Sequence, residues 1–295
     1  MLSAQDRRKL RQIEIKARRS VQTLFAGAYA STYKGQGLMF ANVRPYAYGD
    51  DFRTLDWKVS ARTGVPHVRE FVAEREQTVM IVLDGSASLF FGTDERTKRD
   101  KAAELAIILA TCAAMNRDRV GLLIFTDHVE VYLPPRRSRS HSLHLMERIW
   151  TYQPRSRSTD LNAALQALLN GLRSHTIVFL LSDFLTPPSE YERSLIYAAQ
   201  KHDLTAFYIY DPAEHTLPNA GMMALQDAES HRITVIDTTG TDARTALKRH
   251  AEHHQQARNH VFQRAGVSLW ELPLVEDVII SLGAFFKYKQ QLLKR

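Results

Sequence analysis

The order of apolar and polar positions predicts alternating strands and helices from residue 78 onwards. Uninterrupted apolar runs indicate buried strands at 78–84 and 176–182, because a strand covered on both faces needs no polar positions. This alternation predicts an α/β protein with a Rossmann-like, mostly parallel central sheet flanked by helices. Further strands are predicted at 120–125, 129–133, 204–210, 234–237 and 267–272, and helices at 96–116, 141–151, 161–172, 190–201, 243–265 and 278–293.

The first 76 residues follow a different pattern. An imperfect apolar stripe over residues 5–28, with arginine and lysine on the other faces, predicts a helix. The stripe favours docking on the rest of the protein, while the basic faces leave peripheral contact with a membrane surface open. Residues 29–64 are rich in Gly, Tyr and Arg, and residues 65–76 alternate enough to suggest an extended segment. We therefore expect two domains, residues 1–76 and residues 77–295.

Arginine and aspartate recur at close spacing between residues 44 and 62. Guanidinium and carboxylate groups at this density can tie loops together through forked ion pairs, and composition alone favours this structural role. The alternative is a surface for a partner protein. The residues that we single out for partner binding are Arg44, Arg53, Asp56, Trp57 and Arg62.

The composition is that of a folded protein suited to acidic partners. Of its 295 residues, 44% are hydrophobic and 24% charged, which argues against global disorder. The formal net charge of +7 is concentrated in residues 7–19 and 136–157, and it favours nucleic acid, anionic lipid or an acidic protein surface. These stretches lack the interleaved aromatic residues of single-strand binders, so we interpret them as solvated surface and expect no nucleic-acid partner.

Cysteine content and hydropathy favour a cytoplasmic location. Cys112 is the only cysteine, which fits a reducing compartment, and its apolar neighbours at helical spacing favour core packing over a catalytic role. The longest apolar stretch, residues 102–115, is interrupted by Glu104 and is too short to span a bilayer. The N-terminus has no apolar signal core. We expect a protein without a transmembrane segment.

Oxygen-bearing side chains follow two of the predicted buried strands. Asp84 ends the first strand, with Ser86 and Ser88 after it, and Asp183 ends the second, while Thr159 precedes a predicted helix. The carboxyl ends of parallel strands share one edge of a sheet, so these five side chains can converge. Carboxylates, hydroxyls and water suit Mg²⁺ or Mn²⁺. The alternative is that Asp84 and Ser86 cap the next helix and Asp183 caps a turn.

The motif Asp84-x-Ser86-x-Ser88, with the later Thr159 and Asp183, resembles the metal-ion-dependent adhesion site of von Willebrand factor A domains. That resemblance implies that Asp84, Ser86 and Ser88 bind the metal directly, Thr159 from a second loop, and Asp183 directly or through water. One coordination position would stay open for a carboxylate of a partner protein, and the metal can be absent without that partner.

A second resemblance lies upstream and concerns the bacterial DUF58 family. It implies a signature region before a von Willebrand A-like domain, and a functional link with MoxR-type AAA+ ATPases. Many members carry N-terminal transmembrane helices, which this sequence does not show. The segments that carry this resemblance are Arg44-Pro-Tyr46, Gly49-Asp-Asp51, Arg53, Leu55-Asp-Trp57 and Ser60-Ala-Arg62.

These patterns favour a non-enzymatic, metal-dependent protein-binding module, an adaptor or co-chaperone for such an ATPase. The competing hypothesis is a Mg²⁺-dependent hydrolase of the phosphatase type that uses Asp84. Phosphoaspartate enzymes need a second aspartate two residues further on, where this chain has Ser86, and no lysine is obviously positioned to balance the charge. Phosphate-binding loops and a Gly-x-Ser-x-Gly elbow are absent from the sequence.

Overall fold

A six-stranded sheet forms the centre of the protein. The computed structural model describes residues 4–21, 26–33, 42–50, 52, 55–70, 76–93, 96–216, 218–229 and 231–293. The strand order is β10-β7-β6-β3-β4-β5, and every neighbouring pair is parallel except β4 and β5. The predicted α/β fold with a mostly parallel sheet is therefore confirmed. Its strands are β3 (Thr78–Asp84), β4 (Arg119–Phe125), β5 (Val129–Arg136), β6 (Ile177–Ser182), β7 (Asp203–Tyr210) and β10 (Ser268–Pro273).

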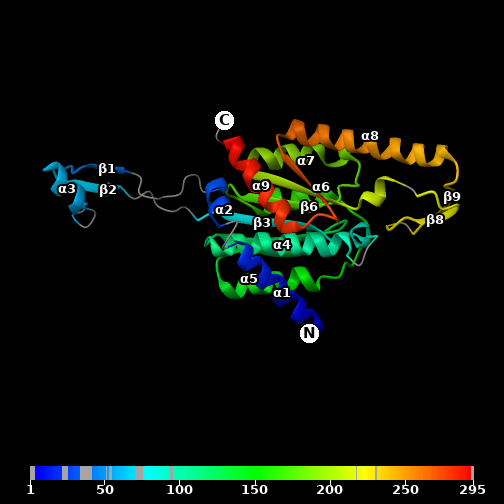
Figure 1. The fold of residues 1–295 in the computed structure, drawn as a ribbon, viewed down its shortest axis with the longest axis horizontal. Helices are drawn as coiled ribbons and strands as arrows, with labels where there is room; N and C mark the ends of the chain where they lie inside the picture. Colours follow the sequence, from blue (N-terminus) through cyan, green and yellow to red (C-terminus); the bar gives the residue numbers. More distant parts are fainter. Residues whose placement is uncertain are drawn as a thin grey trace.

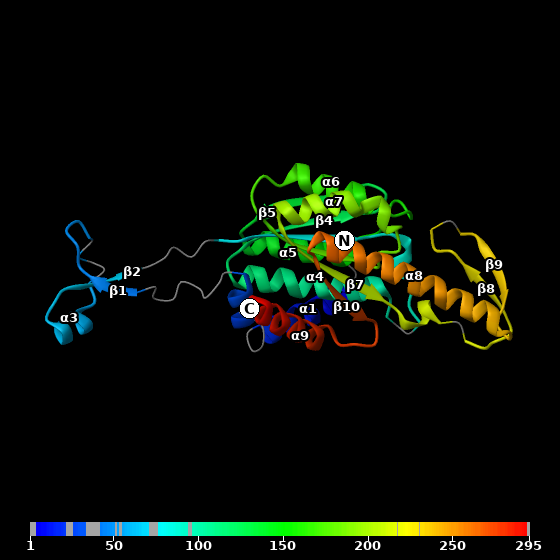
Figure 2. The same ribbon diagram turned by 90° about the horizontal axis from the view of Figure 1, so that it is seen from above.

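Helices cover both faces of this sheet (Figures 1 and 2). Alternate side chains of β3 point to opposite faces, so Val79, Ile81 and Leu83 join one buried cluster while Met80 and Val82 join the other. The first cluster packs against α4 (Lys98–Met115), α5 (Arg139–Thr151) and α9 (Val278–Leu293), and the second against α6 (Leu161–Gly171), α7 (Pro188–Lys201) and α8 (Thr241–Ala265).

Two helices stand where a single helix was predicted over residues 5–28. The first, α1 (Ala4–Ser20), packs on α4, and α2 (Ala26–Tyr33) packs on α9. The predicted helical conformation is confirmed up to Ser20 and again from Ala26, and residues 22–25 lie outside the described residues. The predicted docking on the body is confirmed, since Ala17, Val21 and Tyr29 belong to the first buried cluster.

A small lobe follows these helices. The strands β1 (Asn42–Pro45) and β2 (His67–Glu70) pair antiparallel, and α3 (Trp57–Thr63) lies between them in the chain. The predicted extended segment, residues 65–76, is thus a strand over four residues, and residues 71–75 lie outside the described part. Figures 1 and 2 show the lobe apart from the six-stranded sheet.

A second antiparallel pair extends from the body after β7. The strands β8 (Met222–Gln226) and β9 (Ile233–Asp237) form a hairpin close to the start of α8. The sequence pattern predicted β9 but not β8. Short 3₁₀ helices, η3 (Ala87–Phe90) and η4 (Pro212–His215), follow β3 and β7. In the described residues, no helix combines the length and the apolar character that a membrane crossing requires.

Candidate metal centre

Asp84 lies at the carboxyl end of β3 and is 1% exposed. Two hydrogen bonds fix its carboxylate: the Ser182 hydroxyl donates to Oδ2 at 2.6 Å, and the Ser86 backbone N–H donates to Oδ1 at 2.9 Å. Ser182 in turn accepts from the backbone N–H of Phe184 at 3.0 Å. The ends of β3 and β6 are therefore joined through this aspartate.

The two serines after Asp84 are also buried. Their hydroxyl oxygens lie 3.1 Å apart, and the Ser86 side chain makes no capping bond to η3. Simple helix capping therefore does not account for Ser86. Glycine at position 85 lets the ring of Tyr152 approach the loop closely, because a Cβ there would overlap that ring. The Gly85 N–H donates to the carbonyl of Phe125 at 2.8 Å, which ties the loop to β4.

Asp183 is paired with a buried lysine that the sequence reasoning missed. Lys98, the first residue of α4, is fully buried, and its Nζ lies 2.8 Å from Oδ2 of Asp183. The same ammonium contacts the carboxylate of Glu214. The expectation that no lysine is positioned to balance the charge was therefore wrong. Burial lowers the pKa of Lys98, but the charges of Asp183 and Glu214 outweigh burial, so the pKa is raised and the ammonium persists.

The backbone directly after Asp183 is strained. The next residue, Phe184, has φ of 48°, a left-handed conformation that is rare for an aromatic residue. Its ring is buried against Phe262, with the ring centroids 5.0 Å apart. Packing of this ring offsets the strain, which at such positions is about 1–3 kcal/mol.

The two aspartates influence one another electrostatically. Burial, and then the negative charge of Asp183, raises the pKa of Asp84 to about 7, while hydrogen bonds from Ser182 and Ser86 oppose the shift. Asp84 therefore titrates near neutral pH, and when it is ionised the site holds a buried carboxylate pair with Lys98 bonded to only one of its members. A bound cation would relieve this unfavourable charge.

Thr159 reaches the same edge on the loop before α6. Glu130 holds that loop by accepting from the backbone N–H groups of Arg155 at 2.9 Å and Ser156 at 3.1 Å. Asp160 caps α6 by accepting from the Ala163 N–H at 2.9 Å. The position of Thr159 therefore follows from bonds on both sides of it in the chain.

Glu229 is a further acidic residue next to the candidate metal centre, and the sequence analysis did not predict it. It lies in the turn between β8 and β9, and its Oε1 accepts from the Thr159 hydroxyl at 2.7 Å. Burial raises the pKa of Glu229, the negative charges of Asp183 and Asp227 add to this, and Thr159 opposes it. A two-strand pattern around the turn could have indicated the hairpin, but not its contact with Thr159.

These donors fit a small, hard cation. All are oxygens, and two pairs of them are now joined by hydrogen bonds, Ser86 with Ser88 at 3.1 Å and Thr159 with Glu229 at 2.7 Å. Oxygen ligands of this kind suit Mg²⁺. Among the described residues, no group of three or more His, Cys, Asp or Glu side chains is arranged to hold a metal. Hydroxyls must therefore supply part of any coordination here.

Sequence comparison identifies the family. The model for "Protein of unknown function DUF58" matches residues 42–257, from β1 into α8. The chain belongs to the DUF58 family. Uncharacterized proteins of Mycobacterium bovis and Mycobacterium tuberculosis are 34% identical over 223 residues, which cover 75% of this chain and 70% of each relative.

Comparison with solved structures finds likenesses to this DUF58 protein at low sequence identity. BatB from Bacteroides thetaiotaomicron is 14% identical with a TM-score of 0.48, covering 74% of this chain and 100% of that one. An aerotolerance-related membrane protein from Bacteroides fragilis is 15% identical with a TM-score of 0.45, covering 73% and 99%. Proximal thread matrix protein 1 from mussel byssus, in a structure with a zinc-occupied MIDAS motif, is 15% identical over 45% of this chain and 38% of that one, with a TM-score of 0.36.

The upstream DUF58 residues lie in the small lobe, away from the candidate metal centre (Figure 1). Arg44 forms the predicted forked pair with Asp50, at 2.6 and 2.7 Å. Asp56 is buried and caps α3, accepting from the N–H groups of two residues in its first turn. Trp57 is 72% exposed and Arg62 is exposed, so both are accessible for the predicted partner binding. Arg53 lies outside the described residues.

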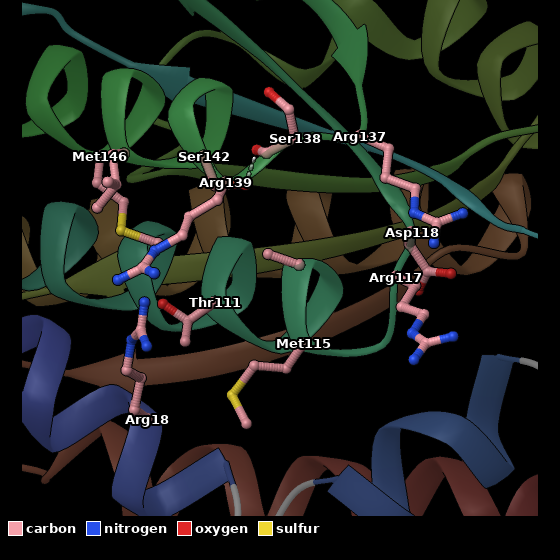
Figure 3. Close-up of a pocket in the computed structure, with 12 residues that line it drawn as sticks. Arg18, Thr111, Met115, Arg117, Asp118, Arg137, Ser138, Arg139, Ser142 and Met146 are labelled. Carbon is pink, nitrogen blue, oxygen red and sulfur yellow. Dashed lines mark hydrogen bonds between the residues drawn. The ribbon is translucent and has the colours of Figure 1, made fainter.

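A basic cavity of about 320 Å³ lies at the opposite end of the sheet (Figure 3). Its lining includes Arg18, Arg117, Arg137 and Arg139, and Figure 3 shows the guanidinium groups of Arg18 and Arg139 directed toward one another. Asp118, which precedes β4, contributes a carboxylate. The cavity adjoins the amino ends of β3 and β4, so it is separate from the candidate metal centre.

Proposed function

We propose that this DUF58 protein is a non-enzymatic protein-binding module of the von Willebrand A type, which recognises a carboxylate of its partner through Mg²⁺ or Mn²⁺. The observation that carries the proposal is the buried pair Asp84 and Asp183, with the buried hydroxyls of Ser86 and Ser88 in the loop that follows Asp84. Asp84, Ser86, Ser88 and Thr159 would hold the cation, with Asp183 binding directly or through water. The bound cation supplies a positive charge to which a carboxylate can bind.

The chain's own residues prepare this site. Ser182 orients Asp84, Lys98 restrains one oxygen of Asp183, and the Glu130-bound loop presents Thr159. Ser86 stands two residues after Asp84, where a phosphoaspartate enzyme would carry its acid–base aspartate, and this favours recognition over turnover.

The proposed partner is a MoxR-type AAA+ ATPase, for which this protein would act as an adaptor or co-chaperone. That identity rests on the DUF58 resemblance and on no contact in this chain. The direct test is binding of the purified chain to the MoxR-type ATPase of the same genome, with Mg²⁺ and with EDTA. We expect Asp84→Ala and EDTA each to abolish binding, while Asp237→Ala, which removes an exposed carboxylate of the hairpin, leaves binding unchanged. Binding unaffected by both EDTA and Asp84→Ala would refute the metal bridge.

One observation favours a second candidate function, a Mg²⁺-dependent hydrolase. Lys98 supplies next to Asp183 the positive charge that the sequence did not reveal. A screen of phosphatase and nuclease substrates with Mg²⁺ and Mn²⁺ tests this function. Turnover that Asp84→Asn abolishes would favour the enzyme over the binding module.

A further inference from the structure

A cavity of about 370 Å³ adjoins the candidate metal centre. It shares walls with that centre, because Ala87 lies between the two serine ligands and Ala228 precedes Glu229 in the hairpin turn. The third wall is the loop that carries Thr159. A partner side chain in this cavity would therefore lie next to a carboxylate bound at the metal. The lining residues are Ala87, Phe90, Gln153, Pro154, Arg155, Arg157 and Ala228.

The charge of this cavity is positive. Arg155 and Arg157 are its charged lining residues, and both are exposed. Their backbone is held firmly: Glu130 accepts from the Arg155 N–H, and the Arg157 carbonyl accepts from the N–H of Ala87 at 3.1 Å. The Arg157 guanidinium also reaches the ring of His231, with Nη1 3.3 Å from Nδ1. Guanidinium groups on a fixed loop are suited to bind carboxylates through paired hydrogen bonds.

We propose that this cavity is a second subsite, in which Arg155 and Arg157 bind a further acidic side chain of the partner. The inference rests on the proposed function, because the first carboxylate of the partner is the one at the metal. Phe90, 40% exposed, adds an apolar wall for the intervening residue. The partner segment is therefore an extended acidic stretch of the Glu-x-Glu type, whose alternate side chains lie on one side about 7 Å apart.

Glu229 lies next to both proposed subsites, because it is bonded to Thr159 and follows Ala228 in the chain. Its carboxylate is held by the Thr159 hydroxyl, and its neighbour Ala228 lines the cavity. An incoming acidic segment would bring like charge against Glu229, so that carboxylate has to move away as the segment binds. The hairpin turn thus supplies the acid that the partner replaces.

The test uses the full chain with saturating Mn²⁺ and two probes, acetate and the blocked tripeptide acetyl-Glu-Ala-Glu-amide, in calorimetric titrations. We expect the tripeptide to bind about tenfold more tightly than acetate. Replacing both arginines, Arg155→Ala with Arg157→Ala, should remove this advantage and leave acetate and Mn²⁺ binding unchanged. The matched control, Arg139→Ala with Arg148→Ala, removes the same charge on α5 and should preserve the advantage.

The outcomes separate the subsite from the proposed function. If the double arginine variant keeps the tripeptide advantage while Asp84→Asn abolishes binding of Mn²⁺ and of both probes, the subsite is wrong and the metal-dependent function stands. If Asp84→Asn binds the tripeptide as tightly as the natural chain, the metal-dependent function fails, and recognition at two points fails with it. Glu229→Gln should tighten tripeptide binding, and weaker binding would contradict displacement of this carboxylate.

Discussion

The two ends of the central sheet hold charges of opposite sign in different surroundings. At the carboxyl end, Asp84 and Asp183 are 1% and 2% exposed, whereas at the amino end the side chains of Arg18 and Arg137 are 46% and 47% exposed. Charges that are withdrawn from water interact strongly, and exposed charges are screened by solvent and salt. Ionic events at the carboxyl end should therefore alter stability, while loss of the exposed arginine charges at the amino end should alter it little.

The largest effect is expected from Lys98→Met, which removes the buried ammonium from the carboxyl end. Asp183 and Glu214 then lose their common partner, and breaking a buried pair in this way costs about 3–5 kcal/mol of unfolding free energy. Chemical denaturation measures the loss. Mg²⁺ should restore part of it, because a cation can take over the charge balance. A variant as stable as the natural chain would show that these buried charges are weakly coupled.

A pH titration of metal-free protein tests the aspartate pair itself. Because burial and Asp183 raise the pKa of Asp84 to about 7, the folded state binds this proton more tightly than the unfolded chain does. The resulting stabilisation is complete below the unfolded pKa of about 3.9 and is lost as the pH rises through about 7. The contribution from this group should fall by on the order of 1–3 kcal/mol between about pH 5 and about pH 8.

The matched variant for that titration is Asp84→Asn, which cannot ionise. It should flatten this part of the pH profile and raise the stability of metal-free protein at about pH 8. Mg²⁺ should stabilise the natural chain at that pH and leave the variant unchanged. An unaltered profile in the variant would assign the titration to another group.

Gly85→Ala tests how closely the carboxyl-end loop is packed. The added Cβ would overlap the buried ring of Tyr152, and we expect destabilisation of about 1–3 kcal/mol together with weaker Mg²⁺ binding. Gly240→Ala is the control, because the structure leaves open space around that Cβ. Thermal unfolding compares the two variants. Equal effects would mean that Tyr152 moves aside readily.

The smallest effect is expected at the amino end. Arg139→Gln removes one of the guanidinium groups that line the basic cavity, and the change in unfolding free energy should stay within about 0.5 kcal/mol. The stabilisation by Mg²⁺ should be the same as in the natural chain. A large change, or a lost response to Mg²⁺, would contradict the contrast between the two ends.

The sequence predicts much of the sheet because its central strands are covered on both faces. The apolar runs of β3 and β6 locate Asp84 and Asp183, and the parallel arrangement places both at one edge. Thr159 could be included because the start of α6 marks the same edge. The contacts that complete the site depend on packing: Lys98 meets Asp183 through the placement of α4, and Glu229 meets Thr159 through the hairpin turn. No local sequence pattern predicts either contact.

The N-terminal region shows where such patterns mislead. Periodicity predicted one helix over residues 5–28, but it did not predict that α1 contacts mainly α4 while α2 contacts mainly α9. The sequence pattern predicted the lobe strand β2 only as part of a longer extended segment, residues 65–76. Local pattern reports the conformation that a segment favours, and tertiary contacts decide where that conformation stops.

The packing of α1, α2 and α9 on one face of the sheet sets practical limits on dissecting the molecule. The family match ends at residue 257, before β10 and α9, and starts after α1 and α2. A fragment cut at residues 42 and 257 would retain every proposed metal ligand but lose an edge strand and much of the cover of the first buried cluster. Such a fragment would expose β7 as a new sheet edge beside bare apolar surface, a combination that promotes self-association.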